Sequence, residues 1–254
     1  MKKIIIVLLL GFVCLQAQEP LDVWVLAGEG NATGAMGDAA YMPPDPIDQK
    51  IPIWWSAAGI SYSDCWVRLR SQPGLFPVGH FGPEISFIRM LKRSGANVAI
   101  FKFTAPNTSL YADWKRPGTG GLYDAMKSEL LSAIQQAQTV FNRDARLAGF
   151  MWLHGESDAG NIVMEMEYAW RFMQLIDDMR LTFGPDFRIV LGIDEQHPDV
   201  RPGCFILQLF QALEMFDSRC AWVSMIGLEK ADQSHLTPAG LIAHGERIFW
   251  ETRE

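Results

Sequence analysis

Apolar residues in this chain occur in short continuous runs, separated by segments in which they recur every three or four positions. Five runs are typical of strands buried on both faces, and they cover residues 21–27, 96–104, 147–154, 188–194 and 221–227. The three-to-four-residue repeat predicts helices over residues 83–93, 123–141, 164–183, 205–216 and 238–252. This alternation of strands and helices predicts an α/β fold, namely a three-layer α/β/α sandwich around a doubly wound, five-stranded parallel sheet.

The segment 34–80 does not follow this alternation. It is rich in proline, glycine and tryptophan and has no clear periodicity. A loop of this length inside a compact domain usually passes over the ligand-binding face. Because no linker or repeat interrupts the rest of the chain, residues 18–254 are interpreted as a single domain.

The first residues are typical of a secretory signal peptide. Lys2 and Lys3 precede the apolar run 4–15, and Ala17 supplies a small residue for cleavage. Cys14 follows residues that match a lipoprotein signal poorly. We therefore predict a signal peptide over 1–17, a secreted or periplasmic mature chain, and no membrane attachment after cleavage.

Charge and cysteine content narrow the classes of partner. The formal charge of −7 argues against nucleic acid, because phosphate binding needs a basic face. Three cysteines remain in the mature chain: Cys65, Cys204 and Cys220. Export permits a disulfide between Cys204 and Cys220, and spacing alone leaves open whether they pair or stay free thiols.

Ligands of open parallel sheets bind beyond the carboxyl ends of the strands. The segment after the last predicted strand carries Asp232 and, three residues later, His235. An aspartate at this spacing can accept a hydrogen bond from the imidazole Nδ1–H and leave Nε2 free as a base. The same pair also occurs in ordinary surface loops that cap a helix, and both interpretations remain open at this point.

Another group of polar residues follows the strand at 147–154. His154, Gly155, Glu156 and Asp158 form a turn whose N–H groups can donate to a developing oxyanion. Their spacing does not match a helical metal-ligand pattern, so neither a metal nor any other cofactor is predicted.

Five blocks in the same order resemble one family, and the resemblance spans nearly the whole mature chain. The chain resembles the SGNH hydrolase superfamily, with its flavodoxin-like fold, in the branch of carbohydrate esterases that includes sialate O-acetylesterase and acetylxylan esterases. The matching blocks are Gly28-Glu-Gly-Asn31, Gly82-Pro-Glu84, Thr108-Ser-Leu110 with Trp114, His154-Gly-Glu-Ser-Asp158, and Asp232 to Thr237.

The departures from the family pattern concern the chemistry. The position of the family's serine nucleophile is Gly30, Glu29 replaces a glutamine, and His154 replaces another glutamine. The resemblance implies that Asp232 and His235 are the orienting acid and the base. It also implies oxyanion or substrate contacts, at Gly82, His154, Gly155, Glu156 and Asn31.

Two functions are compatible with a missing nucleophile. The first is a weak esterase, in which His235 activates a water or in which Glu29 or Thr33 supplies a substitute group. The second is a catalytically inactive pseudoenzyme that binds acetylated or plain glycans. Trp54, Trp55 and Trp114 are candidates for stacking on sugar rings in either case, with core packing as the alternative.

Overall fold

The computed structural model describes residues 19–253, and the predicted signal peptide at 1–17 lies outside the described residues. The body of the sheet consists of parallel strands in the spatial order β2-β5-β1-β6-β7-β8. Their bounds are β1 (Leu21–Gly28), β2 (Pro52–Ala57), β5 (Val98–Thr104), β6 (Ala145–Leu153), β7 (Arg188–Gly192) and β8 (Cys220–Trp222). Two short strands, β3 (Ser61–Tyr62) and β4 (Val67–Arg68), pair with β2 in antiparallel orientation.

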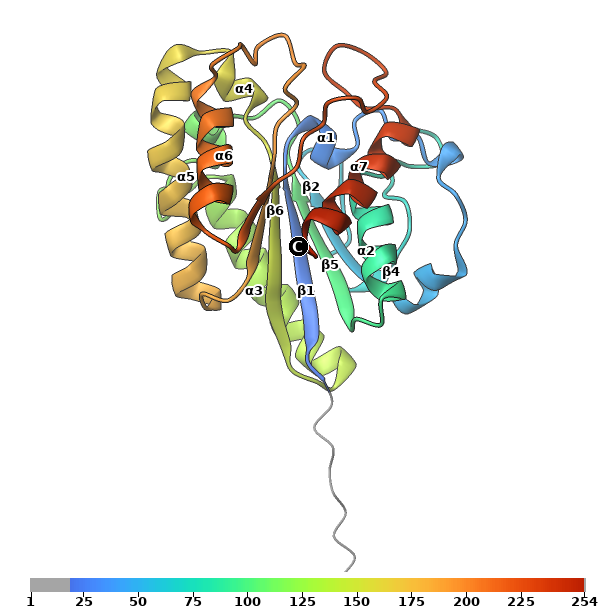
Figure 1. Cartoon of the computed structure of the whole chain (residues 1–254). Coiled ribbons are helices and arrows are strands. Elements are labelled where there is room, and N and C mark those ends of the chain that lie inside the picture. Colours follow the sequence, from blue (N-terminus) through green and yellow to red (C-terminus); the bar gives the residue numbers. More distant parts are fainter. Residues whose placement is uncertain (1–18, 254) are drawn as a thin grey trace, which may run out of the picture.

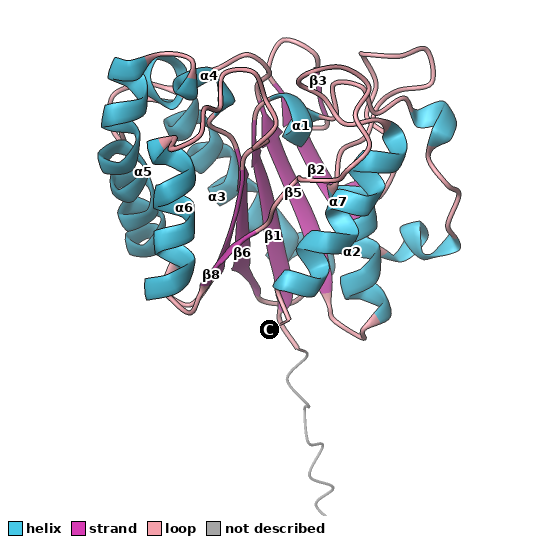
Figure 2. Ribbon diagram, turned by 45° about the horizontal axis from the view of Figure 1, so that its top comes forward, coloured by secondary structure: helices cyan, strands magenta, loops and turns pink. Residues whose placement is uncertain are grey.

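Helices cover both faces of this sheet, as Figures 1 and 2 show. Their bounds are α1 (Gly30–Thr33), α2 (Glu84–Arg93), α3 (Leu122–Phe141), α4 (Glu156–Ala159), α5 (Ile162–Phe183), α6 (Phe205–Phe216) and α7 (Pro238–Glu251). Helices α3, α5 and α6 lie on one face, and α2 and α7 lie on the other. The predicted three-layer, doubly wound α/β sandwich is therefore confirmed.

The two core layers follow from the alternation of side chains along the strands. Val23 and Val25 of β1 pack with Phe172 of α5, whereas Trp24 and Leu26 belong to the core layer under α2 and α7. All of these side chains are almost completely buried. Because neighbouring residues of β1 enter opposite layers, the strand has to be apolar throughout, which is the pattern seen in the sequence.

The prediction of five parallel strands was wrong by one strand. β2 lies in the segment 34–80, which we interpreted as an irregular excursion, and pairs in parallel with β5. It begins at Pro52 and uses Trp54 and Trp55 to fill the two core layers, one on each face. Pro52 interrupts the apolar residues before the two tryptophans and Ser56 follows them, so this segment lacks the continuous aliphatic run by which the other strands were found.

The cysteines in the described part of the chain are free thiols, so the disulfide left open by the sequence does not form. Cys204 and Cys220 are buried without a disulfide, and Cys65 is exposed. None of the helices in the described range 19–253 combines the length and apolar character needed to cross a membrane.

The topology determines which loops meet. From β1 the chain continues to β2 and β5 on one side, and only afterwards reaches β6, β7 and β8 on the other side. The loops that follow β1 and β6 therefore lie next to each other at the point where the order of the strands reverses. Open α/β sheets bind their ligands at this edge.

Candidate active site

The turn after β1 places Gly30 at the first position of α1. Gly28, two residues earlier, has a φ of 145°, and a Cβ there would lie 1.9 Å from the main-chain oxygen of Leu153. That position needs glycine. Gly30 does not have a left-handed backbone, and the only atoms that a Cβ would closely approach belong to His235, at 2.9 Å from Nε2. Gly30 and the candidate base His235 therefore lie next to each other, as expected.

Asp232 and His235 form the predicted pair. The Asp232 Oδ2 atom lies 3.0 Å from the His235 Nδ1 atom, and Oδ1 accepts hydrogen bonds of 2.7 Å from the N–H groups of Ser234 and His235. Partial burial acts to raise the pKa of Asp232, but the hydrogen bonds from His235 and the main chain outweigh it and lower the pKa. An ionised Asp232 holds the imidazole with Nδ1 as donor and leaves Nε2 directed toward Gly30.

Asn31 holds the loop that carries His235. Its Nδ2 atom donates to the Ser234 carbonyl at 3.0 Å, and its Oδ1 atom accepts from the Leu236 N–H at 2.9 Å. Asn31 thus binds the residues directly before and directly after His235. Asn31, which we expected to contact the substrate, thus also positions the base.

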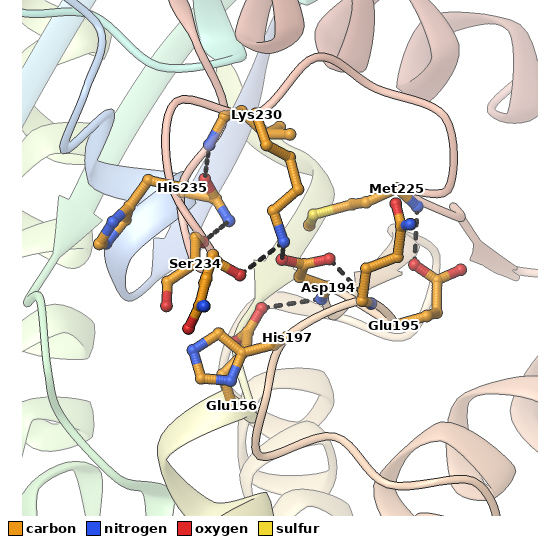
Figure 3. Close-up of polar contacts among 12 residues, drawn as sticks. Glu156, Asp194, Glu195, His197, Met225, Lys230, Ser234 and His235 are labelled. Carbon is orange, nitrogen blue, oxygen red and sulfur yellow. Dashed lines mark hydrogen bonds and ion pairs between the residues drawn. The ribbon is translucent and has the colours of Figure 1, made fainter.

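A partly buried ion pair ties the same loop to the segment that follows β7, as Figure 3 shows. Lys230 Nζ lies 2.5 Å from Asp194 Oδ2 and donates to the Gln233 carbonyl at 2.7 Å. The Asp194 N–H in turn donates to Glu156 Oε1 at 2.8 Å. The His235 loop is therefore connected through Lys230 and Asp194 to the helix α4.

Glu29 and Glu156 are two buried acidic residues in the wall of one cavity. Glu29 accepts from the N–H groups of Gly155 and Ser157 at 3.2 Å, and from the Ser157 hydroxyl at 2.5 Å. Burial raises the pKa of Glu156 to about 8, with the nearby Glu29 as the next cause, and burial also raises the pKa of Glu29. One of the two carboxyl groups therefore carries a proton at neutral pH.

The proton on this pair makes stability depend on pH. A carboxyl whose pKa rises on folding stabilises the protein fully below its unfolded pKa, which is 4.5 for glutamate, and this stabilisation is lost as the pH approaches 8. We expect Glu29→Gln to remove the facing charge, so that its melting temperature exceeds that of the wild type at pH 8 and differs little at pH 5. Thermal unfolding at both pH values measures this effect.

The matched control is Glu246→Gln, which removes a carboxylate from the exposed surface of α7. It should change the melting temperature equally at the two pH values. If Glu29→Gln behaves in the same way as this control, the charge of Glu29 does not contribute to the raised pKa of Glu156.

The prediction that Gly82 supplies an open oxyanion donor was wrong. Its N–H donates to Glu84 Oε1 at 3.0 Å. The same Glu84 oxygen lies 2.9 Å from Lys102 Nζ, and both side chains are fully buried. The Gly-Pro-Glu block thus leads into α2, and its glutamate belongs to a buried polar network with Lys102. The Gly82 N–H is part of this network and is not available to a substrate.

The predictions for His154 and the Gly155 N–H were also wrong. The His154 ring is completely buried and stacks on Trp152 at a centroid distance of 4.6 Å, with Nδ1 3.3 Å from the Tyr168 hydroxyl. Burial lowers the pKa of His154 to about 3, so the ring is neutral. The Gly155 N–H donates to Glu29, as described above. Neither group faces the cavity.

Four further candidates are buried, which rules out the roles predicted for them. The Trp54, Trp55 and Trp114 side chains are at most 3% exposed, so they pack in the core and cannot stack on a sugar. The Thr33 hydroxyl is also buried and donates to the Glu29 carbonyl at 3.2 Å, so it cannot replace the serine. For the three tryptophans, this outcome is the core-packing alternative.

A polar cavity of about 200 Å³ opens beside Gly30. Of the predicted residues, Glu29, Gly30, Asn31, Glu156 and His235 line it. Sequence reasoning missed the other lining residues, which are Asn107, Ser157, His197, Asp199 and Ser234.

Asn107 and His197 both follow strands of the sheet, so the strand-end rule gave a signal for them. Asn107 has a φ of 57° in the loop after β5, and His197 Nδ1 accepts from the Asp199 N–H at 3.2 Å. Figure 3 shows the His197 ring beside Glu156 and Ser234. No cluster of three metal-ligating side chains occurs within residues 19–253.

This arrangement provides an oriented base, His235, in a small cavity whose wall also includes the polar side chains of Asn107 and His197. An imidazole whose Nδ1–H is held by a carboxylate can accept a proton through Nε2 from a water or a hydroxyl group. The site therefore holds a general base next to a cavity that is large enough for a small group.

Comparisons with known proteins identify the family and the fold. A family model described as "Carbohydrate esterase, sialic acid-specific acetylesterase" matches residues 20–252. A solved structure of a protein from Arabidopsis thaliana is 20% identical, with a TM-score of 0.64, covering 92% of this chain and 98% of that one. The structure of NanS is 14% identical, with a TM-score of 0.65, covering 93% and 99%.

A carbohydrate acetylesterase from Xanthomonas citri is 16% identical, with a TM-score of 0.56, covering 91% of this chain and 56% of that one. At these identities, the solved structures establish the similarity of fold. No curated protein matches the sequence.

Proposed function

Because the chain belongs to the carbohydrate esterase family of sialic acid-specific acetylesterases, we propose that it acts on O-acetylated carbohydrates in the cavity beside Gly30. The observation that carries this proposal is the intact Asp232–His235 pair, directed at the position where the family has its serine. The pair retains the contact that orients the base, whereas residue 30 has no hydroxyl group.

The proposed reaction uses water as the nucleophile. His235 Nε2 accepts a proton from the water as its oxygen attacks the acetyl carbonyl, and the Nδ1–H bond to Asp232 stabilises the resulting imidazolium. The imidazolium then returns the proton to the sugar oxygen as the acyl C–O bond breaks. The products are acetate and the free sugar hydroxyl, and no acyl-enzyme forms.

The oxyanion needs donors other than those predicted from the sequence. Gly30 and Asn107 line the cavity, and we propose the main-chain N–H of Gly30 and the side-chain amide of Asn107 as the donors. A single such donor is typically worth about 10²–10³ in rate. A site with these donors and a base, but without a nucleophile, gives slow hydrolysis, in keeping with the roughly 10³–10⁴-fold residual catalysis of enzymes that lack a member of their triad.

A second function is supported by the closeness of His235 to Gly30. The imidazole lies 2.9 Å from the place of a Cβ atom, so it fills part of the space that a serine side chain would use. With the imidazole in this space and no hydroxyl at residue 30, the cavity could hold a glycan without attacking its ester. The second candidate is therefore a pseudoenzyme that binds acetylated or plain glycans.

The cellular location and domain organisation complete the proposal. The amino-terminal pattern over 1–17 supports export, so the chain would meet glycans outside the cytoplasm or in the periplasm. Residues 18–254 would act as one domain, since a single sheet connects elements from Leu21 to Trp222.

Hydrolysis of 4-nitrophenyl acetate and of O-acetylated sialic acid, followed as acetate release, tests the proposal. We expect slow turnover by the wild type and loss to the buffer rate in His235→Ala, because the base is removed. Glu246→Gln, on the exposed surface of α7, is the control and should keep the wild-type rate. Equal rates in His235→Ala and wild type would refute the proposed catalysis, and tight glycan binding without acetate release would establish the pseudoenzyme.

A further inference from the structure

A second hollow of about 570 Å³ lies at the opposite edge of the sheet from His235. Its wall includes Leu21, Pro52 and Val98, which lie at the amino ends of β1, β2 and β5. Ligand pockets commonly have volumes of about 300–1,000 Å³. The size of this hollow is therefore sufficient for a sugar residue, and none of its wall belongs to the candidate active site.

The rim of the hollow carries uncompensated positive charge. Lys50, Arg68 and Arg143 line it, no aspartate or glutamate does, and none of the three forms an ion pair within the described residues. The Arg143 Nε atom is buried and has no hydrogen-bond partner in residues 19–253. Burial, followed by the charges of Arg143 and Lys50, lowers the pKa of the neighbouring Lys92. In a chain of net charge −7, this cluster favours an anion.

Aromatic side chains form another part of the wall. Trp66 and Phe141 are half-buried, and their ring centroids lie 6.3 Å apart with an edge-on orientation. The indole N–H of Trp66 donates to the Ala133 carbonyl at 2.8 Å, which fixes the orientation of the ring. Aromatic rings pack against the apolar faces of pyranose rings and present no hydrogen-bond donor to phosphate.

We propose that this hollow is a second binding site, for a carboxylated saccharide such as a uronic acid oligomer. The guanidinium groups of Arg68 and Arg143 suit the planar carboxylate, Lys50 adds a point charge, and Trp66 and Phe141 contact the sugar ring. The site does not depend on the proposed esterase function, since it lies at the other edge of the sheet. It would hold an acidic glycan on the protein while the cavity beside Gly30 remains accessible.

Calorimetric titration with tri-galacturonate tests the proposal, with its fully methyl-esterified form and inorganic phosphate as the other two probes. We expect tri-galacturonate to bind most tightly and to weaken at 0.5 M salt, because screening acts on exposed charges. The neutral ester should lose most of the affinity, and phosphate should bind less tightly because it gains no aromatic contact. Phosphate binding as tightly as the sugar acid would overturn the assignment to a saccharide.

The double variant Lys50→Gln/Arg68→Gln locates the site. Both residues are exposed, so the fold should tolerate the change, and we expect tri-galacturonate to bind about tenfold more weakly or worse. The matched control Arg70→Gln/Arg116→Gln removes two exposed cations elsewhere and should retain the affinity. Unchanged binding in the first double variant would overturn the site. The Lys50→Gln/Arg68→Gln variant should hydrolyse 4-nitrophenyl acetate at the wild-type rate. The test of the second site is therefore separate from the test of the proposed esterase.

Discussion

Replacing Gly30 by serine is expected to raise acetyl-ester hydrolysis by about 10²-fold or more over the wild type. The backbone at Gly30 is outside the left-handed region, so a side chain causes no strain there. The new hydroxyl would lie beside His235 Nε2, with Asp232 already holding Nδ1. A serine activated in this way divides hydrolysis into two easier steps through an acyl-enzyme.

The serine requires one local adjustment. A Cβ at residue 30 would lie 2.9 Å from Nε2, so the imidazole has to move outward by a few tenths of an ångström. The His235 side chain is 28% exposed, which leaves it room to do so. We expect the restored activity to remain below that of a complete enzyme, because the donors predicted at Gly82 and His154 do not face the cavity.

Gly30→Ala is the control for this experiment, since it adds the same Cβ without a hydroxyl and should give no increase. A fluorophosphonate probe should label Gly30→Ser, as detected by intact mass, and should label neither Gly30→Ala nor the wild type. A folded Gly30→Ser protein that hydrolyses no acetyl ester and takes up no probe would contradict the esterase interpretation. Labelling of the wild type would instead identify a substitute nucleophile.

Local patterns predicted the parts of the site that depend on nearby residues. The spacing of Asp232 and His235 was sufficient because the contact between them lies within one loop. The position of that loop beside Gly30 followed from the strand-end rule, which depends only on the order of strands and helices. The alternation of strands and helices also predicted that helices cover both faces of the sheet.

The errors concern residues whose surroundings come from distant segments. Gly82 appeared to be an open donor, but its N–H is taken by Glu84, which is fixed by Lys102 from β5. His154 appeared to be a substrate contact, but Trp152 and Tyr168 enclose it in the core. Burial of this kind depends on tertiary packing, which residue type and spacing do not encode.

The buried network around Lys102 leads to the second large expected effect. Lys102 Nζ lies 2.9 Å from Glu84 Oε1, 2.8 Å from Gln72 Oε1 and 3.0 Å from the Thr33 carbonyl. We expect Lys102→Met to reduce the free energy of unfolding by about 3–5 kcal/mol, because it leaves a buried carboxylate without its cationic partner. For a domain of this size, that corresponds to a melting temperature lower by roughly 10 °C.

Lys127→Met is the matched control for burial. Lys127 Nζ lies 2.6 Å from Asp178 Oδ2, but both side chains are about one quarter exposed. Water screens such a pair, so its loss should cost about 1 kcal/mol or less. If Lys102→Met is no more destabilising than Lys127→Met in urea unfolding, the interior pair does not stabilise the fold.

The double variant Lys102→Met/Glu84→Gln separates the charge from the shape of this network. The Glu84→Gln change removes the carboxylate charge, and the amide oxygen that it introduces could still accept from the Gly82 N–H. We therefore expect the double variant to be more stable than Lys102→Met alone, since the main cost of the single change is an unpaired buried charge. The network contacts the carbonyl of Thr33, the last residue of the helix that begins at Gly30. Lys102→Met should accordingly also lower the esterase activity of Gly30→Ser, and the double variant should restore part of it.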